Sequence, residues 1–142
     1  MKKFIGTLAA AATLATGTVV LTAPAAQAAT ISGSAVEYVF CSANQHNNEV
    51  TYYDRYGMVE KIVSLPDFDG KVYCGAIEVG IESDSYVWSS IANDHSHYVY
   101  AAIYSVSYPL FSGSTGAPPN RTLVAREESR DRSGGFNYAI AS

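Results

Sequence analysis

Short runs of alternating apolar and polar residues fill most of the chain beyond its N-terminal apolar segment. In the run 35–41, the side chains of Val36, Tyr38 and Phe40 fall on one side of an extended backbone, which is typical of a half-buried strand. Similar runs predict strands at 49–55, 58–65, 71–81, 121–127 and 136–141. These runs show no long helical repeat, so we expect an all-β protein.

Turn-forming residues separate the runs. Tyr56-Gly57 is expected to join 49–55 to 58–65, with Gly57 supplying a positive φ. Asp69-Gly70 predicts a turn ahead of the strand at 71–81, and the charged segment 128–135 predicts another.

The stretch from 85 to 111 has the strongest strand pattern, because two runs of β-branched and aromatic residues flank a polar tip at 93–96. We interpret it as a central hairpin. In its register Trp88 lies opposite Ala101, so a large side chain faces a small one across the strands.

One face of the second run carries Tyr98, Tyr100, Tyr104 and Tyr108. In the hairpin register, Val87 and Ile91 of the first run join this face. If it is open, it is an aromatic platform for a sugar ring, a lipid or a protein. We expect it to be closed and to form half of the core, because burial of Val87 and Ile91 would contribute roughly 1.5–3 kcal/mol each. On the open reading, Tyr98, Tyr100, Tyr104 and Trp88 are the candidate ligand-binding residues.

The number and spacing of the runs predict the fold class. Seven to eight short strands at turn-bounded intervals indicate two antiparallel sheets packed as an immunoglobulin-like sandwich, with a barrel as the alternative. Antibody-type domains have a Trp between their two cysteines, whereas Trp88 follows both cysteines of this chain. The strand order therefore stays open.

Residues 1–28 have the features of a signal peptide. Lys2 and Lys3 precede an apolar stretch at 4–21, and Ala26-Gln27-Ala28 is a small-x-small cleavage site. Threonines and glycines dilute the stretch and no basic stop-transfer cluster follows it, which favours cleavage after Ala28 over a retained membrane anchor. We expect a single secreted, extracellular domain at 29–142 without a stable membrane anchor.

The charge of this domain disfavours nucleic acid as a partner. The chain has nine Lys and Arg against thirteen Asp and Glu. Lys2 and Lys3 belong to the leader, so seven basic residues remain against thirteen acidic ones, a formal charge of −6. This net charge argues against binding nucleic acid or anionic lipid through a basic surface.

Cys41 and Cys74 are the two cysteines of the chain. An even pair in a small exported domain predicts one disulfide, in preference to free thiolates that bind metal or act as nucleophiles. Closing the loop between them would stabilise the fold by roughly 3–4 kcal/mol.

A set of short motifs follows one order along the domain. They are Val50-Thr51-Tyr52 with Asp54 and Gly57, Val63-Ser64-Leu65-Pro66, Ala101-Ala102-Ile103, and Ser133-Gly134 before the last strand. In these motifs the chain resembles the extracytoplasmic β-sandwich of the mycobacterial MmpS small membrane proteins and related small secreted actinobacterial proteins. Asp67 stands where that family has Trp, and its late cysteine pair would fall near Ala101 and Ala139. The resemblance implies a non-enzymatic envelope or export accessory domain and assigns no site residue.

The segment Asp94-His95-Ser96-His97 is the candidate metal site. On extended backbone His95 and His97 point to the same side, which suits zinc or copper, with Asp84 or His46 as a possible third ligand. The alternative is a solvated turn, which we favour because two ligands do not make a structural site.

Catalytic motifs are weak. In Gly113-Ser114-Thr115-Gly116 the serine is one place too early for a nucleophile elbow. The carboxylate pairs Asp67/Asp69 and Glu127/Glu128 could serve a glycosidase only across a cleft that so small a domain hardly offers. Calcium at 67–70 remains an alternative, although the spacing fits no EF-hand. We expect no catalysis and no cofactor.

The loop at 112–121 is rich in turn formers, and Pro118-Pro119 stiffens its end. It is either a plain connection, which we favour, or a protease-inhibitor loop. We therefore expect a secreted, non-catalytic binding module whose partner is a protein, a polysaccharide or another envelope ligand. The alternatives are a protease inhibitor presenting 112–121 and a small metal-binding protein centred on His95 and His97.

Overall fold

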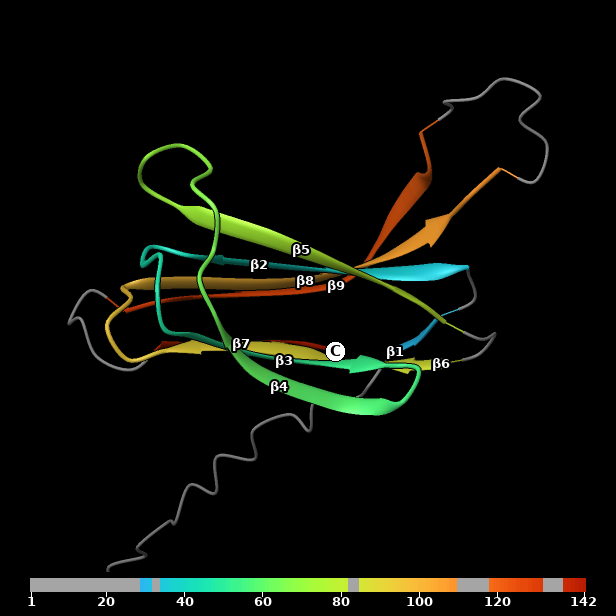
Figure 1. Ribbon diagram of the computed structural model, residues 1–142, viewed down its shortest axis with the longest axis horizontal. Helices are drawn as coiled ribbons and strands as arrows, with labels where there is room; N and C mark the ends of the chain where they lie inside the picture. The colour runs from blue at the N-terminus through green and yellow to red at the C-terminus, as the bar shows by residue number, and fades with distance from the viewer. Residues whose placement is uncertain (1–28, 32–33, 82–84, 110–117, 132–136) are drawn as a thin grey trace, which may run out of the picture.

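A computed structural model describes residues 29–31, 34–81, 85–109, 118–131 and 137–142, and within these ranges it contains ten β-strands and no helix (Figure 1). In chain order they are β1 (Ala29–Ile31), β2 (Ala35–Ser42), β3 (Asn48–Asp54), β4 (Gly57–Val63), β5 (Tyr73–Gly80), β6 (Ser85–Val87), β7 (Ser89–Asn93), β8 (Tyr98–Ser107), β9 (Asn120–Arg130) and β10 (Asn137–Ala141). The strands expected at both ends of the domain, 35–41 and 136–141, are confirmed within a residue.

Eight of these strands form two four-stranded antiparallel sheets that lie face to face (Figure 1). Sheet I has the order β5-β2-β8-β9, and sheet II has the order β10-β7-β3-β4. The short strands β1 and β6 pair with each other. The two-sheet antiparallel sandwich predicted from the sequence is therefore confirmed.

The core lies between the sheets and follows from the alternation of side chains along the strands. Val36, Tyr38 and Phe40 of β2 point inward, as predicted, and are buried. Tyr52 of β3 meets Tyr38 and Phe40 from the other sheet, with ring centroids 5.4 and 6.5 Å apart. The other core residues include Ile31, Val50, Leu65, Val87, Ile91, Val99, Ala101, Ile103, Ala139 and Ala141.

The central hairpin predicted between 85 and 111 is wrong. β7 pairs with β3 and β10, whereas β8 pairs with β2 and β9, so the two strands lie in different sheets. The polar tip 93–96 carries the chain from one sheet to the other. Two strands with one apolar face each can bury those faces across a core as well as side by side, so alternation alone does not decide between the two arrangements.

The β3–β4 hairpin differs from its prediction by one residue. Asp54 pairs with Gly57, so the two turn residues are Arg55 and Tyr56. Gly57 begins β4 with φ 130, where glycine avoids the steric cost of a side chain. At the other end of the chain, β9 runs on to Arg130, into the segment predicted as a charged turn.

Three links between consecutive strands cross from one sheet to the other at the same end of the sandwich, on the left of Figure 1. They are β2 to β3, β4 to β5 and β7 to β8, and β9 ends and β10 begins at this same end. Register places them together, because Ser42 pairs with Tyr73 and Val99, and Asn93 pairs with Asn137.

Buried polar side chains hold this end together. The Asn93 amide donates to the carbonyl oxygens of His46 and Asn47 and to Oδ1 of Asn48, at 2.9–3.2 Å. Ser42 Oγ donates to Ser96 Oγ at 2.9 Å. Such groups are costly to bury unless they are bonded, so these bonds specify where the chain turns between sheets.

The predicted disulfide between Cys41 and Cys74 is confirmed. The two residues lie directly opposite each other on β2 and β5, with Cα atoms 4.1 Å apart. The bond therefore joins neighbouring strands within sheet I, whereas antibody-type domains link their two sheets with a disulfide.

Candidate ligand-binding face

The tyrosines of β8 lie on the outer face of sheet I. Val99, Ala101 and Ile103 point into the core, so Tyr98, Tyr100 and Tyr104, on the alternate positions, point outward. We call Tyr98, Tyr100, Tyr104 and Tyr108 the tyrosine face. Tyr108 is 49% exposed and the other three are half-buried. Our expectation of a closed face that forms half of the core is wrong, and Val87 and Ile91 lie inside the sandwich instead.

The rings of Tyr98, Tyr100 and Tyr104 are partly covered by neighbouring side chains. Ala102 also points outward, yet it is fully buried, so neighbouring side chains must cover it. Burial raises the pKa of the Tyr100 hydroxyl, and the nearby Tyr104 hydroxyl raises it further. Burial likewise raises the pKa of Tyr98, with a further contribution from Glu128. Both hydroxyls therefore stay neutral, able to donate and accept hydrogen bonds, at all physiological pH values.

A depression of about 390 Å³ lies at one end of this face. Its lining combines β8 with β2, the start of β5 and the loop before β5, and consists of Val39, Cys41, Phe68, Asp69, Val72, Cys74, Tyr98 and Tyr100. We call it the aromatic depression. The volume is within the range of small-ligand sites. Its walls are mostly apolar, and the disulfide forms part of them.

The loop 66–72 holds Phe68 over this depression and is fixed by its own hydrogen bonds. Asp67 Oδ1 accepts the Gly70 N–H at 2.7 Å, and Asp69 Oδ1 accepts the N–H groups of Lys71 and Val72 at 2.9 and 2.8 Å. The Phe68 N–H donates to the Val72 carbonyl at 3.0 Å. The turn predicted at Asp69-Gly70 is therefore confirmed, with Gly70 at φ 78.

This loop presents an exposed aromatic ring on a backbone that is held by hydrogen bonds. Phe68 is 74% exposed, although a free phenyl side chain gains by burial. The two N–H groups that donate to Asp69 lower the pKa of its carboxyl. Asp67 and Asp69 each accept hydrogen bonds from backbone N–H groups of the loop, so their carboxylates stabilise the turn.

A second depression, of about 310 Å³, adjoins the first and shares Val72 and Tyr98 with it. Its other lining residues are Ala43, Lys71, His97 and Arg130. We call it the cationic depression. The Arg130 guanidinium carbon lies 4.7 Å from the centroid of the Tyr98 ring, and its Nε lies 3.5 Å from Glu128 Oε1.

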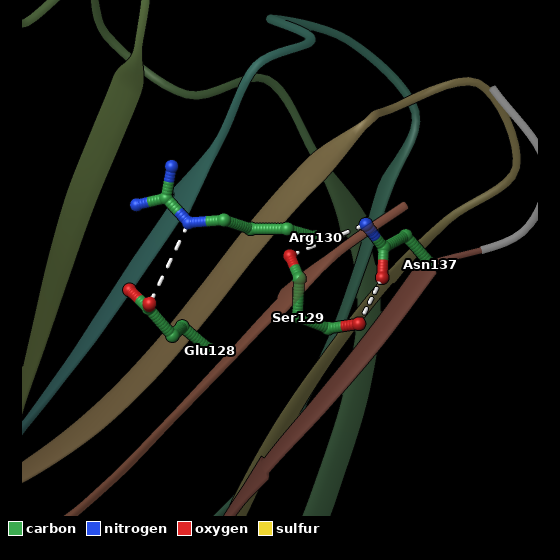
Figure 2. A network of polar contacts seen from close by, with 4 residues as sticks. All are labelled: Glu128, Ser129, Arg130 and Asn137. Carbon is green, nitrogen blue, oxygen red and sulfur yellow. Dashed lines mark hydrogen bonds and ion pairs between the residues drawn. The ribbon is translucent and has the colours of Figure 1, made fainter. Parts of the chain in front are cut away.

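The alternation of β9 sets these side chains apart from the core. Figure 2 shows Glu128 and Arg130 on one side of the strand, and Ser129 turned to Asn137 of β10. The Asn137 amide donates to the Ser129 carbonyl at 3.2 Å, and Ser129 Oγ donates to Asn137 Oδ1. These bonds link β9 to β10 on one side of the strand, while Arg130 lies on the other side.

The far end of the outer face is charged. The Arg121 guanidinium lies 2.9 Å from Oε1 of Glu37, which is buried on β2. The Tyr108 hydroxyl donates to Glu78 Oε1, and this bond raises the pKa of Tyr108. Buried charge requires such partners, so these groups stabilise the sheet surface.

Trp88 does not lie with the tyrosines. It follows β6 and packs edge-to-face on Tyr53 of sheet II, with ring centroids 6.4 Å apart. The four residues predicted as one ligand-binding set are therefore divided between the two sheets, with Tyr98, Tyr100 and Tyr104 on sheet I.

The candidate metal ligands His95 and His97 are both exposed on the link between β7 and β8. His46 lies on the neighbouring link between β2 and β3, where its Nδ1 is 2.9 Å from Ser64 Oγ. Asp84 is outside the described residues. Among the residues that are described, no three His, Cys, Asp or Glu side chains come together in a group able to hold a metal ion.

The candidate inhibitor loop is described only from residue 118 onward. Its 112–117 part is outside the described residues. Arg121, the residue that we would expect a protease to read, lies in β9 and its guanidinium is bound to Glu37. That ion pair disfavours presentation of Arg121 to a protease.

Sequence reasoning did not find Phe68 or Lys71 as site residues. Phe68 lies in the turn that was predicted correctly at 67–70, whereas Lys71 was expected to begin a strand and instead lies in the loop ahead of β5. An exposed aromatic between two aspartates was the available signal, because Asp-x-Asp-Gly fixes a turn and leaves the intervening side chain outside.

The fold and this face together define a two-sheet β-sandwich with an open aromatic surface beside a disulfide. Comparison with protein-family models, with curated proteins and with solved structures finds no match to the chain. No helix in the described part of the chain is long and apolar enough to cross a membrane.

Proposed function

We propose that this chain is a secreted, non-catalytic module that binds an extracellular polysaccharide through the outer face of sheet I. The aromatic depression is the observation that carries the proposal. It combines half-buried tyrosine rings, an exposed Phe68 and a rigid boundary formed by the disulfide and the loop 66–72.

The composition of the depression suits sugar rings. The C–H face of a pyranose is apolar and can pack on an aromatic ring, while its hydroxyls need hydrogen-bond partners. Tyr98 and Tyr100 each offer an aromatic ring and a hydroxyl that can donate and accept hydrogen bonds. A protein partner of standard size would bury about 800 Å² on each side. A depression of about 390 Å³ suits one or two sugar rings better.

Rigidity favours binding. A loop that is already fixed loses little conformational freedom when a ligand docks. The hydrogen bonds of the loop 66–72 order the backbone that carries Phe68 before any ligand arrives.

Secretion and the absence of catalysis are parts of the same proposal. The signal-peptide pattern at 1–28 and the disulfide between Cys41 and Cys74 both fit an oxidising, extracytoplasmic location. The resemblance to the MmpS envelope domains, which stays a prediction, would agree with a non-enzymatic role outside the cytoplasm.

Sedimentation with insoluble polysaccharides tests the proposal. Chitin, cellulose and a purified actinobacterial cell-wall fraction would each be mixed with the wild type. We expect retention on at least one, weakened about tenfold or more by Phe68→Ala and by Tyr100→Ala, since each removes apolar contact area.

Tyr56→Ala is the matched control. Tyr56 is 80% exposed at the tip of the β3–β4 hairpin in sheet II, so its loss should leave retention unchanged. Absence of retention on every polysaccharide, or retention that Phe68→Ala and Tyr100→Ala both leave intact, would contradict the proposal.

A further inference from the structure

The cationic depression stands out against the overall charge of the chain, which is −4. Its lining includes Lys71, His97 and Arg130 and no acidic side chain among the described residues. Lys71 and Arg130 are two cations close together on an acidic protein, which favours an anionic group at that one place.

Arg130 is partly free to bind. Its Nε contacts Glu128, and Figure 2 shows the two terminal nitrogens turned away from that carboxylate. The planar guanidinium also rests against the Tyr98 ring, which limits its motion. An arginine held this way keeps a pair of donors with the spacing of a carboxylate.

Lys71 supplies the second cation. The salt bridges of the described residues join Arg121 to Glu37 and Arg130 to Glu128, and Lys71 takes part in neither. Asp69 is close to Lys71, but its Oδ1 already accepts two backbone N–H groups of the loop. Among the described residues no carboxylate is paired with the Lys71 ammonium, so the ammonium can contact a ligand.

We propose that the two depressions together bind a uronic-acid unit of an acidic polysaccharide. The sugar ring lies against Tyr98, Tyr100 and Phe68, and the carboxylate lies between Lys71 and Arg130. This inference rests on the proposed function, because it names the substrate class of the same face.

The shared wall of the two depressions favours a carboxylate on the ring itself. Tyr98 and Val72 line both, so the anionic group must lie within one sugar unit of the packed ring. A uronic acid has this arrangement. In a glycerol-phosphate polymer the anionic group belongs to a flexible chain and has no ring beside it to occupy the aromatic depression.

Titration calorimetry with trigalacturonate and its trimethyl ester tests the inference, because the ester keeps the ring and removes the charge. We expect the acid to bind about ten- to hundredfold more tightly than the ester, as befits hydrogen bonds to a charged group. Lys71→Ala should remove most of that difference, while Phe68→Ala should weaken both ligands.

Lys61→Ala is the control for loss of one positive charge. Lys61 lies on β4 of sheet II, where its ammonium is 5.3 Å from the Tyr52 ring centroid, and it should leave the affinity unchanged. Circular dichroism of each variant would verify that the sandwich is intact. Both Lys71 and Phe68 are exposed, so their replacement should not affect folding.

Each result has one meaning. Preference for the acid that depends on Lys71 supports the inference. Equal affinity for acid and ester, no binding of either, a preference that Lys71→Ala leaves intact, or tighter binding of a glycerol-phosphate polymer would overturn it. The proposed function would still stand in all these cases if an insoluble polysaccharide were retained in a Phe68-dependent way, so the two failures can be distinguished.

Discussion

The two outer faces of the sandwich use similar residues but offer different surfaces. On sheet I, half-buried rings border a depression whose wall is completed by Phe68 and the disulfide. On sheet II, small side chains lie at the centre, where Thr51 and Ser90 pair with each other. Large apolar side chains there, such as Met58 and Ile62, stand exposed at 61% and 72%.

The difference comes from a loop and not from aromatic content. Sheet II also has Tyr53 and Trp88, but these two rings pack on each other. On sheet I the loop 66–72 leads into β5, the edge strand, and its side chains border the aromatic depression. An aromatic sheet face thus becomes a candidate site where a fixed loop borders it.

Removing the disulfide should have the largest effect on the difference between the outer faces of sheet I and sheet II. Replacing Cys41 and Cys74 together by Ala should lower the free energy of unfolding by about 3–4 kcal/mol, because the unfolded chain loses a constraint. Urea unfolding would measure this loss. Polysaccharide retention should also fall, because the loop that carries Phe68 is no longer tied covalently to β2. Wild-type protein treated with a reductant should show the same two effects. Unchanged retention in folded protein would show that the hydrogen bonds of the loop suffice.

Tyr38→Phe tests the contact between the two sheets. The Tyr38 hydroxyl donates to the Tyr53 carbonyl of sheet II at 2.8 Å, and its loss should cost about 1 kcal/mol at neutral pH. Burial raises the pKa of Tyr38 above its usual value of 10.0. The associated stability is complete below pH 10 and declines at higher pH, by up to about 1.4 kcal/mol per pH unit.

Unfolding free energies measured between pH 8 and pH 11 would check this prediction. We expect the wild-type curve to fall more steeply than the Tyr38→Phe curve above pH 10. Parallel curves would mean that the hydroxyl ionises as readily in the folded state as in the unfolded one.

The pair of rings on sheet II should have a smaller effect. A double-mutant cycle with Tyr53→Ala and Trp88→Ala should give a coupling of about 0.5 kcal/mol, typical of a partly exposed edge-to-face contact. Neither substitution should alter retention on polysaccharide. A loss of retention would place the binding surface on sheet II and reverse the comparison.

The smallest effect concerns the loop itself. The backbone N–H groups of Lys71 and Val72 lower the pKa of Asp69 below its usual value of 3.8. The stability that this carboxylate gives the loop is therefore present above pH 3.8 and lost as the pH falls through the lowered pKa. Carbon-detected NMR titration of the Asp69 carboxyl would check the direction. A midpoint at or above 3.8 would show that those bonds do not form in solution.

The strands could be predicted from the sequence because each carries a local period of two, as in Val36, Tyr38 and Phe40. Their partners could not. Val87 and Ile91 would bury their side chains equally well beside β8 or across the core from it. The deciding groups are polar: Asn93 and Ser96 reach across to the β2–β3 link and turn the chain between sheets.

The candidate site, too, could be predicted from the sequence only in part. The sequence pattern placed Tyr98, Tyr100 and Tyr104 on one face, which the structure shows, but it favoured that face as part of the core, which is wrong. It grouped Trp88 with them only because of the incorrect hairpin. Phe68 and Lys71 join the site through the disulfide-linked pairing of β5 with β2, a contact between distant segments that no local pattern reports.

The clustering of the links between the two sheets at one end of the sandwich affects the local stability of that end. The strand ends joined by buried asparagine side chains should be the last to exchange their backbone N–H hydrogens with solvent. The strand ends on the opposite side of the sandwich should exchange first. Cys41, Cys74 and Tyr98 all belong to the first of these two ends. The proposed sugar site would thus lie at the end of the sandwich that opens least, so its shape would change little when a ligand binds.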